Sequence, residues 1–171
     1  LTADEAKQYK GYDAIISQEK DLLLSITIAD CVPVLIYDSR TESVAAIHAG
    51  WKGTVAGIVG KTLEKMDRKF GTKGEDCFAF VGTCIDECSF EVGDWVAKKF
   101  DSKFKAWNEE RQKYFVDLKK ANKVQLLNFG IPETQIEISP YSTVLNNDNF
   151  FSHRKEKGMT GRMLAVIGMK K

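Results

Sequence analysis

Three short apolar runs near the start of the chain constrain its fold most. Residues 22–29, 32–37 and 43–47 are rich in Leu, Ile and Val, and each is short for a helix. We therefore expect three buried strands. Proline cannot donate a ladder hydrogen bond, so Pro33 predicts an edge, a bend or a bulge between the first two runs rather than one long central strand.

Helical spacing follows these runs. Apolar residues recur with that spacing over residues 55–70, and Gly71 ends the pattern. The same spacing predicts a second helix over residues 92–104. Asp117 is a good N-cap for a third helix, which should end before Gly130.

Later apolar runs predict further strands at residues 78–81, 135–138 and 163–169. We see no repeat, low-complexity tract or linker. The sequence thus predicts one α/β or α+β unit, a single domain over residues 1–171.

The composition excludes several classes of protein. With a net charge of +1, the chain gives no reason to expect a nucleic-acid or membrane partner. No apolar run approaches the roughly 20 residues of a membrane-spanning helix. The first residues are polar and acidic, so we expect no signal peptide, although the chain does not begin with Met. Four cysteines in 171 residues do not resemble a disulfide framework, which favours a reducing, cytoplasmic location.

Cys31 and His48 are the main candidates for chemistry. Each stands at the end of an apolar run, and thiol and imidazole are ligands that zinc prefers. A buried, inert Cys and a hydrogen-bonded core His are the alternatives. Asp30 favours a site, because a carboxylate at the end of so apolar a run needs a partner.

Glycines follow two of the predicted strands. Gly50 and Gly53, after His48, allow backbone N–H groups to approach an anion. Gly82 likewise follows the predicted strand at residues 78–81, where the chain passes from strand to loop. A tight turn with close helix packing is the alternative explanation for both.

Two arginines precede the last predicted strand. Arg154 and Arg162 could bind phosphate or carboxylate through a planar fork of donors, and Thr160 adds a hydroxyl. A basic surface loop is the alternative.

Six ordered motifs carry a resemblance to a known family. They are Ala29-Asp30-Cys31-Val32-Pro33-Val34, His48-Ala49-Gly50-Trp51-Lys52-Gly53, Phe90-Glu91-Val92-Gly93, Asp117-Leu118-Lys119-Lys120-Ala121-Asn122, Phe150-Phe151-Ser152 and Thr160-Gly161-Arg162-Met163. In this order the chain resembles the YfiH family over residues 12–169. That family is also called the polyphenol oxidase or laccase-domain family, and its members are regarded as purine nucleoside phosphorylases.

The resemblance implies the family's α/β (mixed α+β) architecture with sheets flanked by helices, a zinc site and a substrate class. The family's metal-binding cysteine corresponds to Cys31 and one of its histidines to His48, while a second histidine belongs to a motif upstream of residue 1. The chain therefore resembles a member that lacks the N-terminal part of the family domain. The implied substrates are phosphate with adenosine, inosine or methylthioadenosine, and adenosine deamination is an implied side activity. Asp30 could then orient His48 or a bound water. An oligomer is compatible with the sequence.

The copper in the family's older name fits the sequence poorly. A multicopper oxidase needs a His₂Cys copper and a further cluster with many imidazoles, and this chain has two histidines. Two alternatives to a zinc-dependent phosphorylase stay open. Cys31 and His48 could serve a cysteine hydrolase as nucleophile and base, or the chain could be an inactive structural fragment.

Overall fold

A five-stranded sheet forms the centre of the protein. The computed structural model describes residues 11–171, and its central sheet has the strand order β1-β4-β3-β5-β9. Only the β5–β9 pair is parallel. The five strands are β1 (Ala14–Ser17), β3 (Val32–Asp38), β4 (Ser43–Ala49), β5 (Cys77–Val81) and β9 (Ile136–Ile138).

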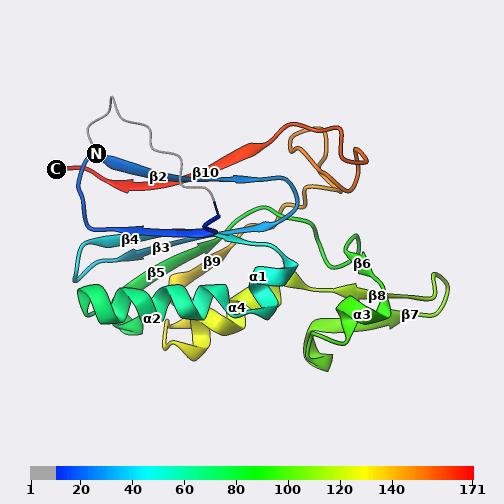
Figure 1. The fold of residues 1–171 in the computed structure, drawn as a ribbon, viewed down its shortest axis with the longest axis horizontal. Coiled ribbons are helices and arrows are strands. Elements are labelled where there is room, and N and C mark those ends of the chain that lie inside the picture. Colours follow the sequence, from blue (N-terminus) through cyan, green and yellow to red (C-terminus); the bar gives the residue numbers. More distant parts are fainter. Residues whose placement is uncertain (1–10) are drawn as a thin grey trace.

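Helices cover one face of this sheet (Figure 1). The amphipathic helix α2 and helix α4 enclose the larger apolar core, in which Leu63 and Leu126 are fully buried. Asp117 caps α4, because its side chain accepts a hydrogen bond from the N–H of Lys120. The helices on this side are α1 (Trp51–Val55), α2 (Ile58–Phe70) and α4 (Leu118–Asn128).

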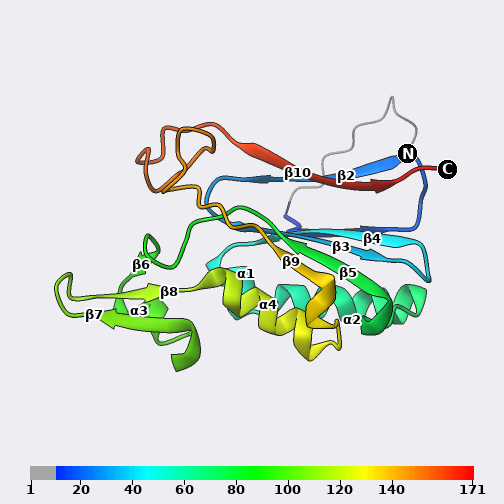
Figure 2. The same ribbon diagram turned by 180° about the vertical axis from the view of Figure 1, so that it is seen from behind.

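A two-stranded antiparallel sheet lies over the opposite face of the central sheet (Figure 2). It pairs β2 (Leu22–Ile28) with β10 (Met163–Met169) and encloses a smaller apolar core. On β5, Phe78 and Phe80 alternate with buried neighbours and remain 51% and 36% exposed. The small sheet therefore covers the central sheet only in part.

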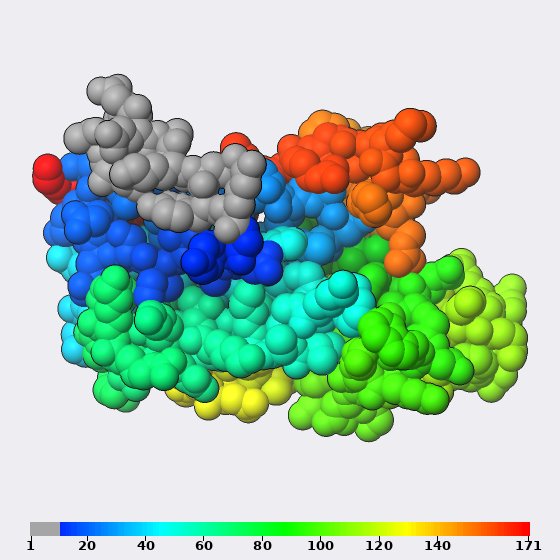
Figure 3. All heavy atoms as spheres, in the orientation of Figure 1, coloured from blue at the N-terminus to red at the C-terminus, as the bar shows by residue number. Residues whose placement is uncertain are grey.

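A third sheet forms a projecting lobe at one end of the molecule (Figure 1). Its order is β6-β8-β7, and α3 lies beside it. In Figure 3 the segment before β10, coloured orange, lies at the same end of the protein as this green lobe. The elements of the lobe are β6 (Glu91–Val92), α3 (Asp94–Ala97), β7 (Lys105–Asn108) and β8 (Lys113–Val116).

The structure corrects two expectations about individual elements. The helix expected over residues 92–104 is wrong in extent: it is a two-residue strand, the four-residue helix α3 and a short 3₁₀ turn. The helix expected over residues 55–70 breaks at Gly57, whose φ of 73° is left-handed, so that α2 starts at Ile58.

Pro33 lies in an interior strand. It is the second residue of β3 and faces His48 on β4, while pairing with β5 begins only at Val34. Its missing N–H is tolerated because it stands near the start of the strand, before the second ladder begins. Among residues 11–171, no helix is long and apolar enough to cross a bilayer.

Candidate functional site

Cys31 and His48 meet where β3 begins and β4 ends. Val32 pairs with Ala49, which places Cys31 beside Gly50 at the next step of the ladder. A Cβ added to Gly50 would lie 3.1 Å from Cys31 Sγ and 3.9 Å from His48 Cε1. Gly50 thus leaves room for the thiol and the imidazole to share one small space.

Hydrogen bonds change the acidity of His48. Its bond with the Cys31 side chain is the largest cause, and a bond with Asp13 adds to it, while burial acts in the opposite direction. Together they raise the pKa of His48 to about 9. The imidazole therefore sits between a sulfur and a carboxylate that both favour its protonated form.

Asp13 is a site residue that the sequence did not reveal. Its Oδ1 lies 2.9 Å from His48 Nδ1, and its backbone carbonyl accepts the His48 N–H at 2.7 Å. Asp13 stands just before β1, an edge strand of four residues whose short pattern predicts little. The only available signal was an acidic residue directly preceding a short apolar run.

Asp30 lies next to Cys31 but its carboxylate points to other partners. Oδ1 accepts hydrogen bonds from the hydroxyls of Thr143 at 2.6 Å and Ser152 at 2.7 Å, and Oδ2 accepts the backbone N–H of Arg154 at 2.6 Å. Asp30 is 9% exposed and has a φ of 82°. The carboxylate on His48 Nδ1 is that of Asp13.

Arg154 links the segment before β10 to the projecting lobe. Its Nη1 and Nη2 donate to the carbonyls of Ser89 and Glu91 at 3.1 and 3.2 Å, and its guanidinium lies 5.5 Å from the centre of the Phe90 ring. These two bonds use two of its five N–H donors.

The other predicted anion-binding residues have local partners. Arg162 Nη1 donates to the carbonyls of Thr160 and Gly161, so its guanidinium folds back on its own loop. The N–H of Gly82 donates to the Pro33 carbonyl at 2.8 Å. A Cβ at Gly82 would lie 2.7 Å from Pro33 Cγ, which explains the need for glycine there.

Cys31 and His48 fit part of a zinc site. Thiolate and imidazole are zinc ligands, and a carboxylate on the distal ring nitrogen is a common support for a metal-binding histidine. Within the described residues, however, no group of three His, Cys, Asp or Glu side chains is arranged to hold a metal ion. A catalytic zinc commonly takes three protein ligands, so this pair would supply two of them.

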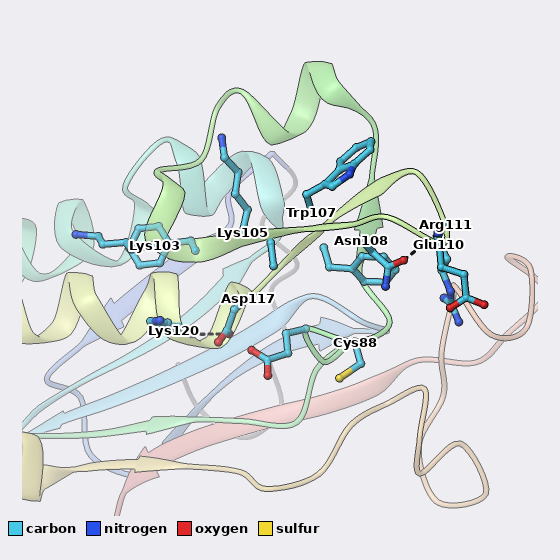
Figure 4. Close-up of a pocket in the computed structure, with 13 residues that line it drawn as sticks. Cys88, Lys103, Lys105, Trp107, Asn108, Glu110, Arg111, Asp117 and Lys120 are labelled. Carbon is cyan, nitrogen blue, oxygen red and sulfur yellow. Dashed lines mark hydrogen bonds between the residues drawn. The ribbon is translucent and has the colours of Figure 1, made fainter.

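A pocket of about 630 Å³ lies between the projecting lobe and the start of α4 (Figure 4). Basic, acidic and aromatic side chains line it, including Lys105, Trp107 and Asp117. Neither Cys31 nor His48 is among its lining residues. The candidate chemistry therefore lies outside this pocket.

The chain is similar to several known proteins. A family model described as multi-copper polyphenol oxidoreductase laccase matches residues 1–170. The chain is 44% identical over 163 residues to a purine nucleoside phosphorylase of Bacteroides thetaiotaomicron, covering 92% of this chain and 60% of that protein. It is 35% identical to the purine nucleoside phosphorylase YlmD of Bacillus subtilis, with 94% of this chain and 60% of that protein covered.

Solved structures show the same fold. The hypothetical protein YfiH of Bacillus licheniformis superposes with a TM-score of 0.87 at 36% identity, over 92% of this chain and 61% of that one. YlmD of Geobacillus stearothermophilus gives a TM-score of 0.86 at 34% identity, over 94% of this chain and 62% of that one. The chain therefore spans about 60% of the length of these relatives.

Proposed function

The chain belongs to the multi-copper polyphenol oxidoreductase laccase family, and on that premise we propose that it carries the reaction centre of a purine nucleoside phosphorylase. The observation that carries the proposal is the cluster of Cys31, His48 and Asp13 beside Gly50. The proposed substrates are phosphate and adenosine, inosine or methylthioadenosine.

Phosphorolysis requires a held anion and a stabilised leaving base. Phosphate attacks C1′ of the ribose, the bond from C1′ to the purine nitrogen breaks, and the base leaves with the bonding electrons and takes up a proton. The ribose passes through an oxocarbenium-like state, which a nearby anion stabilises. We assign phosphate or ribose contacts to Arg154, Arg162 and Thr160, with the backbone N–H of Gly50 as a further donor; the N–H of Gly82 is already bonded to Pro33.

The proposed metal is zinc, held in part by Cys31 and His48. Bound there, zinc would supply a Lewis acid, which also suits the proposed adenosine deaminase side activity. Asp13 holds His48 through Nδ1 and so directs the other ring nitrogen toward the shared space.

The test measures hypoxanthine release from inosine by the full native protein, with and without inorganic phosphate. We expect release to depend on phosphate and to be lost in Cys31→Ala and His48→Ala. Cys88→Ala is the matched control, because Cys88 is exposed and lies in the pocket of the projecting lobe. Release that ignores phosphate, or that survives both site variants, would overturn the proposal.

A cysteine hydrolase is the second candidate, and Asp13 is the observation that favours it. Cys31, His48 and Asp13 form a chain of thiol, imidazole and carboxylate, which is the order of groups in a nucleophile–base–orienter triad. A metal-bound thiolate is not a free nucleophile. Ester hydrolysis that iodoacetamide blocks and zinc inhibits would therefore favour the hydrolase.

A further inference from the structure

Asp30 is buried and has a strained backbone, and both features cost free energy unless other contacts offset them. The residue is 9% exposed, and its φ of 82° is a conformation that residues other than glycine rarely adopt. A buried carboxylate without partners would be strongly destabilising. Three short hydrogen bonds, at 2.6–2.7 Å, satisfy it instead.

These bonds join distant parts of the chain beside Cys31. The donors lie in Thr143, Ser152 and Arg154, which follow Asp30 by 113, 122 and 124 residues. The backbone carbonyl of Asp30 also accepts the N–H of Ile85 at 3.0 Å. One residue thus fixes the segment before β10 and the loop after β5 against the start of β3.

Arg154 is held at both its backbone and its side chain. Its backbone is bound by Asp30, and two of its guanidinium donors are bound by the carbonyls of Ser89 and Glu91. Its other three N–H donors are free of these contacts. Asp30, the neighbour of Cys31, therefore fixes the backbone from which that guanidinium extends, while Ser89 and Glu91 hold two of its donors.

We propose that Asp30 is a positioning residue, which acts by placing Arg154 for anion binding rather than by orienting His48. This inference rests on the proposed function, because inorganic phosphate is the anion that the reaction requires. The geometry supports it: the Asp30 carboxylate binds the Arg154 backbone, whereas Asp13 is the carboxylate bound to His48.

The test compares Asp30→Asn with Asp38→Asn. Asparagine tolerates a positive φ, so the change mainly removes the charge and replaces one of the two acceptor oxygens with an NH₂ donor. Asp38 is a matched control because it is also buried and fully hydrogen-bonded, but it stands at the opposite end of β3 from Cys31. Ser152→Ala, which removes a single donor to Asp30, serves as a milder second variant.

Three measurements decide the outcome: amide hydrogen exchange over residues 150–158, calorimetric binding of inorganic phosphate, and zinc content. Losing hydrogen bonds to a charged acceptor should speed exchange and weaken phosphate binding by roughly 10- to 100-fold in Asp30→Asn. Ser152→Ala should show a smaller change in the same direction. Zinc content should stay unchanged, and Asp38→Asn should alter none of the three.

The position of Arg154 can be tested directly. Arg154→Lys should weaken phosphate binding, and adding Asp30→Asn should not weaken it further. Both changes remove the same contact, that of Arg154 with phosphate, so their effects should not add. Additive losses, unchanged phosphate binding in Asp30→Asn, or unchanged exchange would each overturn the inference. If inosine phosphorolysis is absent while these binding results hold, the proposed function fails and the positioning role stands.

Discussion

Gly50→Ala should separate the chemistry of the site from the stability of the fold. The backbone of Gly50, with φ −68° and ψ 171°, is one that alanine adopts without strain. The added methyl group would lie 3.1 Å from Cys31 Sγ, closer than an ordinary van der Waals contact. The sulfur must therefore move by a few tenths of an ångström.

Two effects of different size follow. Reduced entropy of the unfolded chain stabilises a tolerated Gly→Ala change by about 0.4–1 kcal/mol, and the close contact offsets part of it. We expect the free energy of unfolding to change by less than about 1 kcal/mol. Metal–ligand distances tolerate only about 0.2 Å, so zinc affinity should fall by at least about tenfold.

The assay pairs chelator competition for zinc with urea unfolding. Gly60→Ala is the control: it lies inside α2, and an added Cβ meets nothing within 4 Å. It should stabilise the protein by up to about 1 kcal/mol and leave zinc affinity unchanged. A folded Gly50→Ala protein with wild-type zinc affinity would refute the reasoning, because Cys31 and His48 would then not hold the metal.

Three further predictions concern other parts of the molecule. Leu63→Ala, at a fully buried position of α2, should lower the free energy of unfolding by about 2–5 kcal/mol in urea titrations. Burial raises the pKa of Asp38, but hydrogen bonds from Thr41 and Arg40 outweigh it and hold that pKa below its usual 3.8. Its stabilising effect is thus present above pH 3.8 and is lost as the pH falls through the lowered pKa, so unfolding curves of Asp38→Asn and wild type should converge in acid. Arg162→Lys keeps the charge but loses the planar fork; it should raise the KM for phosphate and leave zinc content unchanged, and an unaltered KM would remove Arg162 from the site.

The spacing of apolar residues was sufficient to predict the helices and strands that bury one continuous face. Helix α2 and strands β2 to β5 have regular apolar patterns because each packs against a core. The projecting lobe was missed because β7 and β8 are four-residue strands with little burial. Phe100 and Phe104 recur at helical spacing, yet a turn separates them, since that spacing does not require a continuous helix.

The sequence could predict only those site residues whose reactive side chains stand at the end of an apolar strand. Cys31 and His48 each follow an apolar run, and pairing of β3 with β4 brings them together. Asp13 was missed because it is 60% exposed and precedes a weak edge strand. The partners of Asp30 lie more than 110 residues away, and local patterns contain no information about such distant contacts.

The pair of Cys31 and His48 and the pair of Asp30 and Arg154 differ in sequence separation. Cys31 and His48 flank a single hairpin, and closing a hairpin takes about 1–10 μs. The contact of Asp30 with Arg154 spans 124 residues and depends on a long chain closure. During folding, the thiol and the imidazole should therefore meet early and Arg154 should arrive late. Variants that loosen Arg154 should then mainly speed unfolding and leave the folding rate unchanged, which stopped-flow kinetics can measure.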